Sequence, residues 1–145
     1  MCTKVTSEMH ISHGKTICYK VVKLPWDATF KDRLLHKIGL KRSYLTPFQL
    51  TNVKIGMEYS GTPSLSKQYI DITTKVGNEI GVGFIHSLQS KEDAIKIAKS
   101  IAISNNVAVI ECVIPDETPY FEGIWSNVLY PSYASTNIKY VRRVY

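Results

Sequence analysis

The chain has 145 residues, of which 44% are hydrophobic and 21% charged, a composition typical of a folded globular domain and not of a disordered or fibrous protein. No apolar run approaches the roughly 20 residues of a membrane-spanning helix, and the first residues lack the apolar stretch of a secretory signal, which argues against both classes. The formal net charge of +6 favours anionic partners, although a basic surface that only keeps the protein soluble is an equal alternative.

The first part of the chain predicts an arm, a strand and a helix. Residues 1–14 have no hydrophobic period and indicate a loosely held arm. The segment 16–24 is rich in β-branched and aromatic residues and stops at Pro25, which predicts a strand. Asp27 then offers an N-cap and Gly39 a C-terminal stop for a short amphipathic helix. Its apolar residues are Phe30, Leu34, Leu35 and Ile38.

The outer face of this helix carries a basic cluster. Between positions 31 and 42 five basic residues stand against one acid, Asp32, a local charge of five minus one, or +4. The basic residues are Lys31, Arg33, Lys37, Lys41 and Arg42. Such a cluster attracts phosphates or nucleic acid, and a solvated face is the alternative.

The middle of the chain predicts short strands. Residues 48–59 indicate one or two strands interrupted by Gly56, residues 69–73 alternate as a half-exposed strand does, and residues 82–87 follow a glycine-rich stretch. A turn or exposed loop is expected at 60–64.

The last part of the chain has the clearest local patterns. Ser90 and Asp93 resemble a capping box and open an apolar stripe, which predicts a helix over 90–104. Residues 107–114 predict a central strand, and residues 120–124 and 137–145 two further strands. We therefore expect one domain over residues 1–145, of the α+β class. Its sheet would be curved, mostly antiparallel or mixed, with about six strands and two main helices packed on it.

His86 is the most suggestive polar residue. It ends a strand just before the predicted second helix, where unpaired backbone N–H groups and the helix dipole attract anions. Its imidazole could donate to a phosphate or act as a general base. A histidine satisfied by a loop carbonyl is the structural alternative.

Tyrosines and arginines gather in the last quarter of the chain. Aromatic side chains beside arginines can stack on nucleobases, but they can equally form a packed sheet face or a self-association surface. Together with the strand residue Lys20, these features give one set of candidate ligand-binding residues. The set is Lys20, His86, Ser87, Tyr140, Arg142 and Arg143.

Other chemistry has little support in the sequence. His10, His13 and Cys2 lack a convincing fourth zinc ligand, so no metal site is predicted. Neither a phosphate-binding loop nor a dinucleotide fingerprint is present, so no cofactor is predicted. Cys18 and Cys112 lie in apolar runs and form no C-x-x-C pair, which predicts free buried thiols and a cytoplasmic location.

Several short segments, spread over most of the chain, carry a resemblance. They are Met1-Cys2, Ile17-Cys18-Tyr19-Lys20, Thr46-Pro47-Phe48, Gly83-Phe84-Ile85-His86-Ser87 followed by Glu92-Asp93-Ala94, Ile110-Glu111-Cys112-Val113-Ile114-Pro115, and Tyr133-Ala134-Ser135. In this order they resemble a group of small uncharacterised proteins carried by bacteriophages and by prophage-like regions of bacterial genomes. The resemblance implies a source and no agreed activity.

A second resemblance is to the ADP-ribosyltransferase-like fold. Lys20 stands where that fold has an Arg or His that grips NAD, and residues 84–94 are similar to its Gly-aromatic strand and Ala-rich helix. The resemblance implies a catalytic glutamate, for which Glu111 and Glu122 are the nearby candidates.

We therefore expect a non-enzymatic binding protein for an anionic small molecule, such as a nucleotide or a nucleotide-derived signal that a phage protein would sequester from host defence. The alternative is an NAD-using enzyme of the ADP-ribosyltransferase type, acting through Lys20, His86 and Glu111. A nucleic-acid-binding or protein-interaction module is a further alternative. No membrane partner is expected, and self-association is left open.

Overall fold

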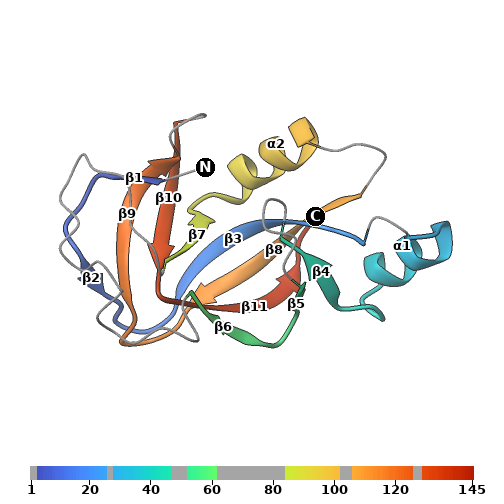
Figure 1. Cartoon of the computed structure of the whole chain (residues 1–145), viewed down its shortest axis with the longest axis horizontal. Coiled ribbons are helices and arrows are strands. Elements are labelled where there is room, and N and C mark those ends of the chain that lie inside the picture. The colour runs from blue at the N-terminus through green and yellow to red at the C-terminus, as the bar shows by residue number, and fades with distance from the viewer. Residues whose placement is uncertain (1–2, 26–27, 47–51, 62–83, 102–105, 126–128) are drawn as a thin grey trace.

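The computed structural model describes residues 3–25, 28–46, 52–61, 84–101, 106–125 and 129–145 (Figure 1). Within these ranges the chain forms eleven strands and two helices. In chain order they are β1 (Thr3–Val5), β2 (His10–Ile11), β3 (Thr16–Lys23), α1 (Phe30–Lys37), β4 (Ser43–Leu45), β5 (Asn52–Lys54), β6 (Glu58–Ser60), β7 (Ile85–Leu88), α2 (Lys91–Ile101), β8 (Val107–Ile114), β9 (Pro119–Trp125), β10 (Tyr130–Ser135) and β11 (Asn137–Arg143).

The strands form one sheet, ordered β1-β9-β10-β7-β3-β8-β11-β6, with β2 added to β9 and the β4–β5 hairpin added to β3. Every strand pairing in the described part of the chain is antiparallel. Figure 1 shows the sheet bending, so that β9 and β10 stand steeply to β8 and β11. The predicted α+β fold with about six strands is therefore wrong, because the described protein is mostly sheet.

The strands that sequence reasoning missed are short or poor in β-forming residues. β1, β2 and β4 have three, two and three residues, too few for an alternating pattern to stand out. β10 contains Pro131 and three small residues, yet it pairs along its length with β9 and partly with β7. These strands depend on partners far along the chain, which local patterns do not reveal.

Residues 3–12, part of the segment expected to be a loose arm, are attached to β9 and the turn that precedes it. β1 and β2 both pair with β9. Beyond β2, Ser12 is buried, and its backbone N–H donates to the Thr118 carbonyl while its carbonyl accepts from the Glu117 N–H. Its hydroxyl accepts from the Thr118 N–H at 2.8 Å and donates to the Pro115 carbonyl. This side chain therefore fixes the attachment point.

The elements with strong local patterns are confirmed. β8 has the bounds predicted for the central strand, and Ser90 caps α2 by accepting a hydrogen bond from the Asp93 N–H. The one or two strands predicted over residues 48–59 correspond to β5 and β6, with Gly56 between them at φ +93°. The predictions for residues 48–51, 69–73, 82–83 and 102–104 lie outside the described residues.

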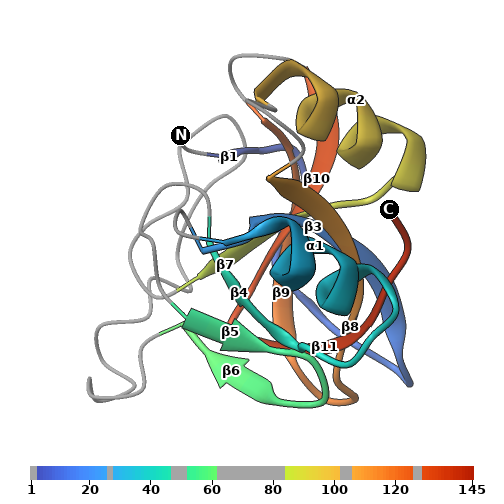
Figure 2. The same ribbon diagram turned by 90° about the vertical axis from the view of Figure 1, so that its right-hand side faces the viewer.

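The central pair β3–β8 has a covered face on each side (Figure 2). On one side, α2 packs Ala94, Ile97 and Ala98 against Val21, Val107 and Val109. The other side is packed by residues of β4, β5 and β11. Its buried residues are Cys18, Val22, Leu24, Tyr44, Val53, Ala108, Ile110, Cys112, Ile114, Ile138 and Tyr140. Alternate residues of β8 thus enter different cores.

Helix α1 exposes Lys31 and Lys37, as expected of a basic outer face, but it also exposes most of its apolar residues. Thr29, and not Asp27, is its N-cap, in a capping box with Asp32, and Asp27 lies outside the described residues. Gly39 follows the helix with φ +84°, as expected of a C-terminal stop. Of the apolar residues expected against the sheet, Phe30, Leu34 and Ile38 are 77%, 49% and 60% exposed. No helix of the described residues is long and apolar enough to cross a membrane.

Replacing Ser12 by alanine should lower the free energy of unfolding by about 1–3 kcal/mol, because the buried Thr118 N–H and Pro115 carbonyl each lose a partner. Urea denaturation measures this change. Ser60→Ala, at an exposed serine of β6, is the matched control and should leave stability unaltered. Equal stability of the Ser12 variant and the unaltered protein would contradict the role given to this hydroxyl.

Candidate functional site

Three of the predicted site residues lie on one face of the sheet. Cross-strand partners share a face, and Lys20 on β3 and Arg143 on β11 both pair with Ile110 of β8. In the next row, Tyr140 pairs with Cys112, which pairs with Cys18. The structure therefore brings Lys20, Tyr140 and Arg143 to the face that carries the larger core, although Ile110 separates Lys20 from Arg143.

Lys20 is the charged group of this interior. Its Nζ donates to the backbone carbonyl of His86 at 2.6 Å. Burial lowers the pKa of Lys20. A negative charge on Cys112 or Cys18 would raise this pKa and so act against the effect of burial. The same burial raises the pKa of the Cys18 thiol to about 11 and that of Cys112 well above its usual value. Both thiols are therefore protonated at neutral pH and poor nucleophiles.

His86 and Ser87 lie beside these groups. Burial lowers the pKa of His86 from 6.5 to about 4, and the positive charge of Lys20 lowers it further in the same direction. Its imidazole is therefore neutral at pH 7 and cannot attract an anion by charge. The buried Ser87 hydroxyl opposes the rise in the Cys18 pKa, although it forms no hydrogen bond of regular geometry with any described residue.

Arg142 lies apart from the other predicted site residues. A register shift between Tyr140 and Arg142 turns it to the α2 side of the sheet, where it pairs with Glu111. Its Nε and Nη2 donate to the two carboxylate oxygens at 2.9 and 3.3 Å. Glu111 is also the cross-strand partner of Tyr19, so this acid stands on the opposite face from Lys20.

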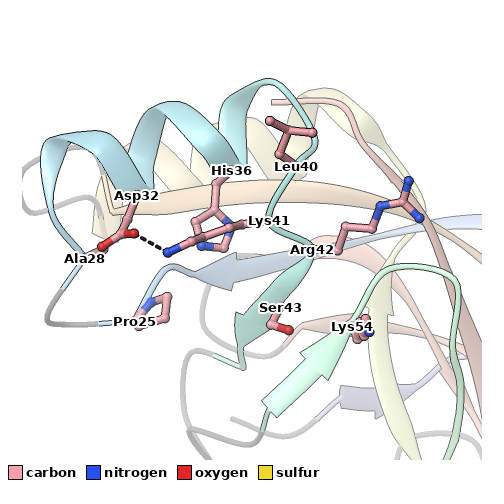
Figure 3. A pocket seen from close by; sticks show the side chains of 9 residues that line it. All are labelled: Pro25, Ala28, Asp32, His36, Leu40, Lys41, Arg42, Ser43 and Lys54. Atoms are coloured by element: carbon pink, nitrogen blue, oxygen red, sulfur yellow. Dashed lines mark hydrogen bonds and ion pairs between the residues drawn. The ribbon is translucent and has the colours of Figure 1, made fainter.

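A groove opens where α1 meets the β4–β5 hairpin (Figure 3). It has a volume of about 620 Å³. Its lining residues are Pro25, Ala28, Asp32, His36, Leu40, Lys41, Arg42, Ser43 and Lys54. We call it the α1 groove. Three of these side chains are basic and one is acidic, so the lining has an excess of positive charge.

The acid of the groove is already neutralised. Lys41 Nζ forms an ion pair with Asp32 Oδ1, and this hydrogen bond, followed by that of the Thr29 N–H, holds the pKa of Asp32 far below its usual range. In Figure 3, Asp32, His36 and Lys41 approach one another while Arg42 extends away from them. Neither Arg42 nor Lys54 forms an ion pair with any described residue.

His36, which lines the groove, lies next to buried polar atoms that are not part of the lining. Its ring packs on Tyr44 with 4.8 Å between centroids. His36 Nδ1, Tyr44 Oη and Arg143 Nη1 are buried and form no hydrogen bond of regular geometry among the described residues, although Arg143 acts against the rise in the Tyr44 pKa that burial causes. Burial lowers the pKa of His36, and the charges of Arg143 and Lys41 lower it further. Such atoms are costly to bury, and sites for polar ligands often contain them.

Sequence reasoning found part of this groove and missed the rest. Lys41 and Arg42 belong to the basic cluster noted on the first helix, but His36, Tyr44 and Lys54 gave no signal. His36 and Lys54 line the groove, Tyr44 lies behind His36, and the three come from α1, β5 and β4, which only the hairpin brings together. No three histidine, cysteine, aspartate or glutamate side chains of the described residues converge as metal ligands.

Comparison with protein-family models, curated proteins and solved structures found no match to this chain. The function therefore has to be argued from the groove and the interior alone.

The stability of the protein should depend on pH through His86. Because its folded pKa lies near 4 and its unfolded pKa near 6.5, the unfolded chain binds a proton first as pH falls. The free energy of unfolding should therefore decrease as the pH falls from 6.5 to 4, and His86 should account for about 3 kcal/mol of this decrease.

Chemical denaturation of the unaltered protein and of His86→Gln across this pH range measures the difference between their slopes. The glutamine variant should lose less stability on acidification. His13→Gln, at an exposed histidine, is the control and should keep the full slope. A slope that is identical in all three proteins would show that His86 is not buried in its neutral form.

Proposed function

We propose that this protein binds an anionic small molecule of nucleotide size in the α1 groove. The observation that carries the proposal is the state of the groove's charges. Lys41 forms an ion pair with Asp32, the single acid of the groove, whereas Arg42 and Lys54 have no carboxylate partner among the described residues. Phosphate oxygens are the natural partners of such unpaired cations.

The rest of the lining supports a nucleotide rather than a bare phosphate. Pro25, Ala28 and Leu40 add an apolar surface beside the basic side chains, as a base and a phosphate together require. The volume of about 620 Å³ is within the range of small-molecule sites.

The proposal keeps the ligand class expected from the sequence and moves its site. His86 and Lys20 lie in the interior, where the neutral imidazole and a lysine held by a carbonyl supply little free positive charge. Arg143 is the member of the predicted set that approaches the new site, since its charge affects both His36 and Tyr44.

Binding is favoured over catalysis by the separation of the candidate catalytic groups. An ADP-ribosyltransferase-type reaction would need Lys20, His86 and Glu111 around one substrate, but Glu111 lies across the sheet and is bound by Arg142. A protein that binds a nucleotide and releases it unchanged suits a role in sequestering a signal. The resemblance to phage-carried proteins is the reason to propose such a setting.

Isothermal titration with adenosine, guanosine, cytidine and uridine monophosphates tests the proposal. At least one should bind, while the matching nucleoside, which lacks the phosphate, should bind far more weakly. Lys54→Gln and Arg42→Gln should each raise the dissociation constant by about tenfold or more, because each removes a charge-assisted contact to phosphate.

Lys99→Gln is the matched control, because Lys99 is an exposed lysine in the last turn of α2, on the other side of the central strands. Its affinity should equal that of the unaltered protein. Equal affinity for nucleoside and nucleotide, or equal losses in all three variants, would overturn the proposed site. Recovery of a chemically altered nucleotide would instead favour an enzyme.

A further inference from the structure

Helix α1 presents three of its four apolar residues to solvent and turns Asp32 and His36 toward the protein. Phe30, Leu34 and Ile38, spaced four residues apart, form a row on one side and are 77%, 49% and 60% exposed. We call this row the α1 stripe. On the opposite side lie Asp32 and the buried His36, which line the α1 groove. A surface helix normally has the reverse arrangement, so the exposed stripe requires an explanation.

Two lysines flank the α1 stripe. At 100° per residue, Lys31 and Lys37 lie about 60° to either side of Leu34 around the helix axis. Both are exposed, and neither forms an ion pair with a described residue. The acid of this helix, Asp32, faces the groove and is held by Lys41. The stripe therefore has a positive border with no acid on its side of the helix.

The position of the helix limits what can cover the stripe. Figure 1 shows α1 at one end of the molecule, away from the body of the sheet, and Figure 2 shows its outer side facing away from β3 and β8. The stripe is thus a narrow, projecting apolar surface. A stable interface between two rigid proteins needs roughly 800 Å² from each partner, far more than three side chains provide.

A second copy of this chain is a poor partner for the stripe. Two-fold association through α1 would place Lys31 and Lys37 near the same lysines of the other copy. It would also bring together two chains of net charge +6. Like charges at an interface oppose association unless acids intervene, and the described residues around the stripe supply none.

We propose that α1 docks this protein on the surface of an anionic lipid bilayer, a partner that the sequence alone did not lead us to expect. The α1 stripe enters the boundary between headgroups and acyl chains, while Lys31 and Lys37 remain at the level of the headgroups and contact their phosphates and carboxylates. A bilayer needs no shape complementarity to a short projecting helix. This inference concerns the outer side of α1 and does not depend on nucleotide binding in the groove.

Co-sedimentation with vesicles tests the docking. The protein should bind vesicles of phosphatidylcholine mixed with phosphatidylserine, bind pure phosphatidylcholine weakly, and dissociate as salt is added. Lys31→Gln and Lys37→Gln should each reduce partitioning about fivefold. The double variant Phe30→Ser/Leu34→Ser should reduce it by about tenfold or more, because it removes the inserted apolar surface.

Leu129→Ser is the matched control, since Leu129 is 74% exposed and precedes β10, away from α1. It should partition like the unaltered protein. Because all these residues are exposed, every variant should keep its melting temperature, and the α1 stripe variant should keep its affinity for nucleotide if the groove binds one.

Three outcomes would overturn the proposal. The first is absence of binding to the phosphatidylserine vesicles, which is expected if an acidic protein, and not a bilayer, covers the stripe. The second is dimerisation that the Phe30→Ser/Leu34→Ser variant abolishes, without vesicle binding. The third is equal partitioning of the stripe variant and the Leu129 control. If Lys54→Gln lowers the affinity for nucleotide but leaves vesicle binding unchanged, the docking proposal stands and the two sites are shown to be separate.

Discussion

The pairing of β3 with β8 is the interaction on which the rest of the structure depends. Eight residue pairs, from Thr16 with Ile114 to Lys23 with Val107, hold these strands in one register. Both faces of the pair are covered, so a slip of one residue would exchange the two cores and turn Lys20 to the wrong side. The same register sends Glu111 to the α2 side. The separation of the candidate catalytic groups therefore follows from the register of the central strands.

The sequence predicts the elements whose patterns are local. β8 is recognisable because it is a run of β-branched and small apolar residues broken only by Glu111 and Cys112, and α2 because its stripe and its cap at Ser90 agree. β2 and β10 could not be predicted, because their stability comes from pairing with β9, which is distant from β2 in the chain. Such pairing leaves no period in a segment of two residues or in one that contains proline.

The candidate site, too, could be predicted only in part from the sequence. Lys20 and His86, both members of the predicted set, do come together, but burial makes the histidine neutral. Arg142 and Arg143 are adjacent in the sequence and therefore face opposite sides of the sheet, but the register shift after Tyr140 places Arg143, and not Arg142, on the same face as Tyr140. No residue pattern announces such a bulge. The groove depended on the β4–β5 hairpin, whose contribution, Lys54, had no sequence signal of its own.

Helix α1 is held with its apolar stripe exposed by hydrogen bonds at its two ends and by one ion pair. The Thr29–Asp32 capping box secures its start, and the N–H groups of Leu40 and Lys41 both donate to the Leu35 carbonyl at its end. The Lys41–Asp32 pair then ties the polar side to the groove. Arg42 and Lys54 form no such pair with a described residue, so an anion that they bind in the groove does not have to displace Lys41 from Asp32. The contact that holds the polar side of the helix is therefore separate from the cations on which the proposed site rests.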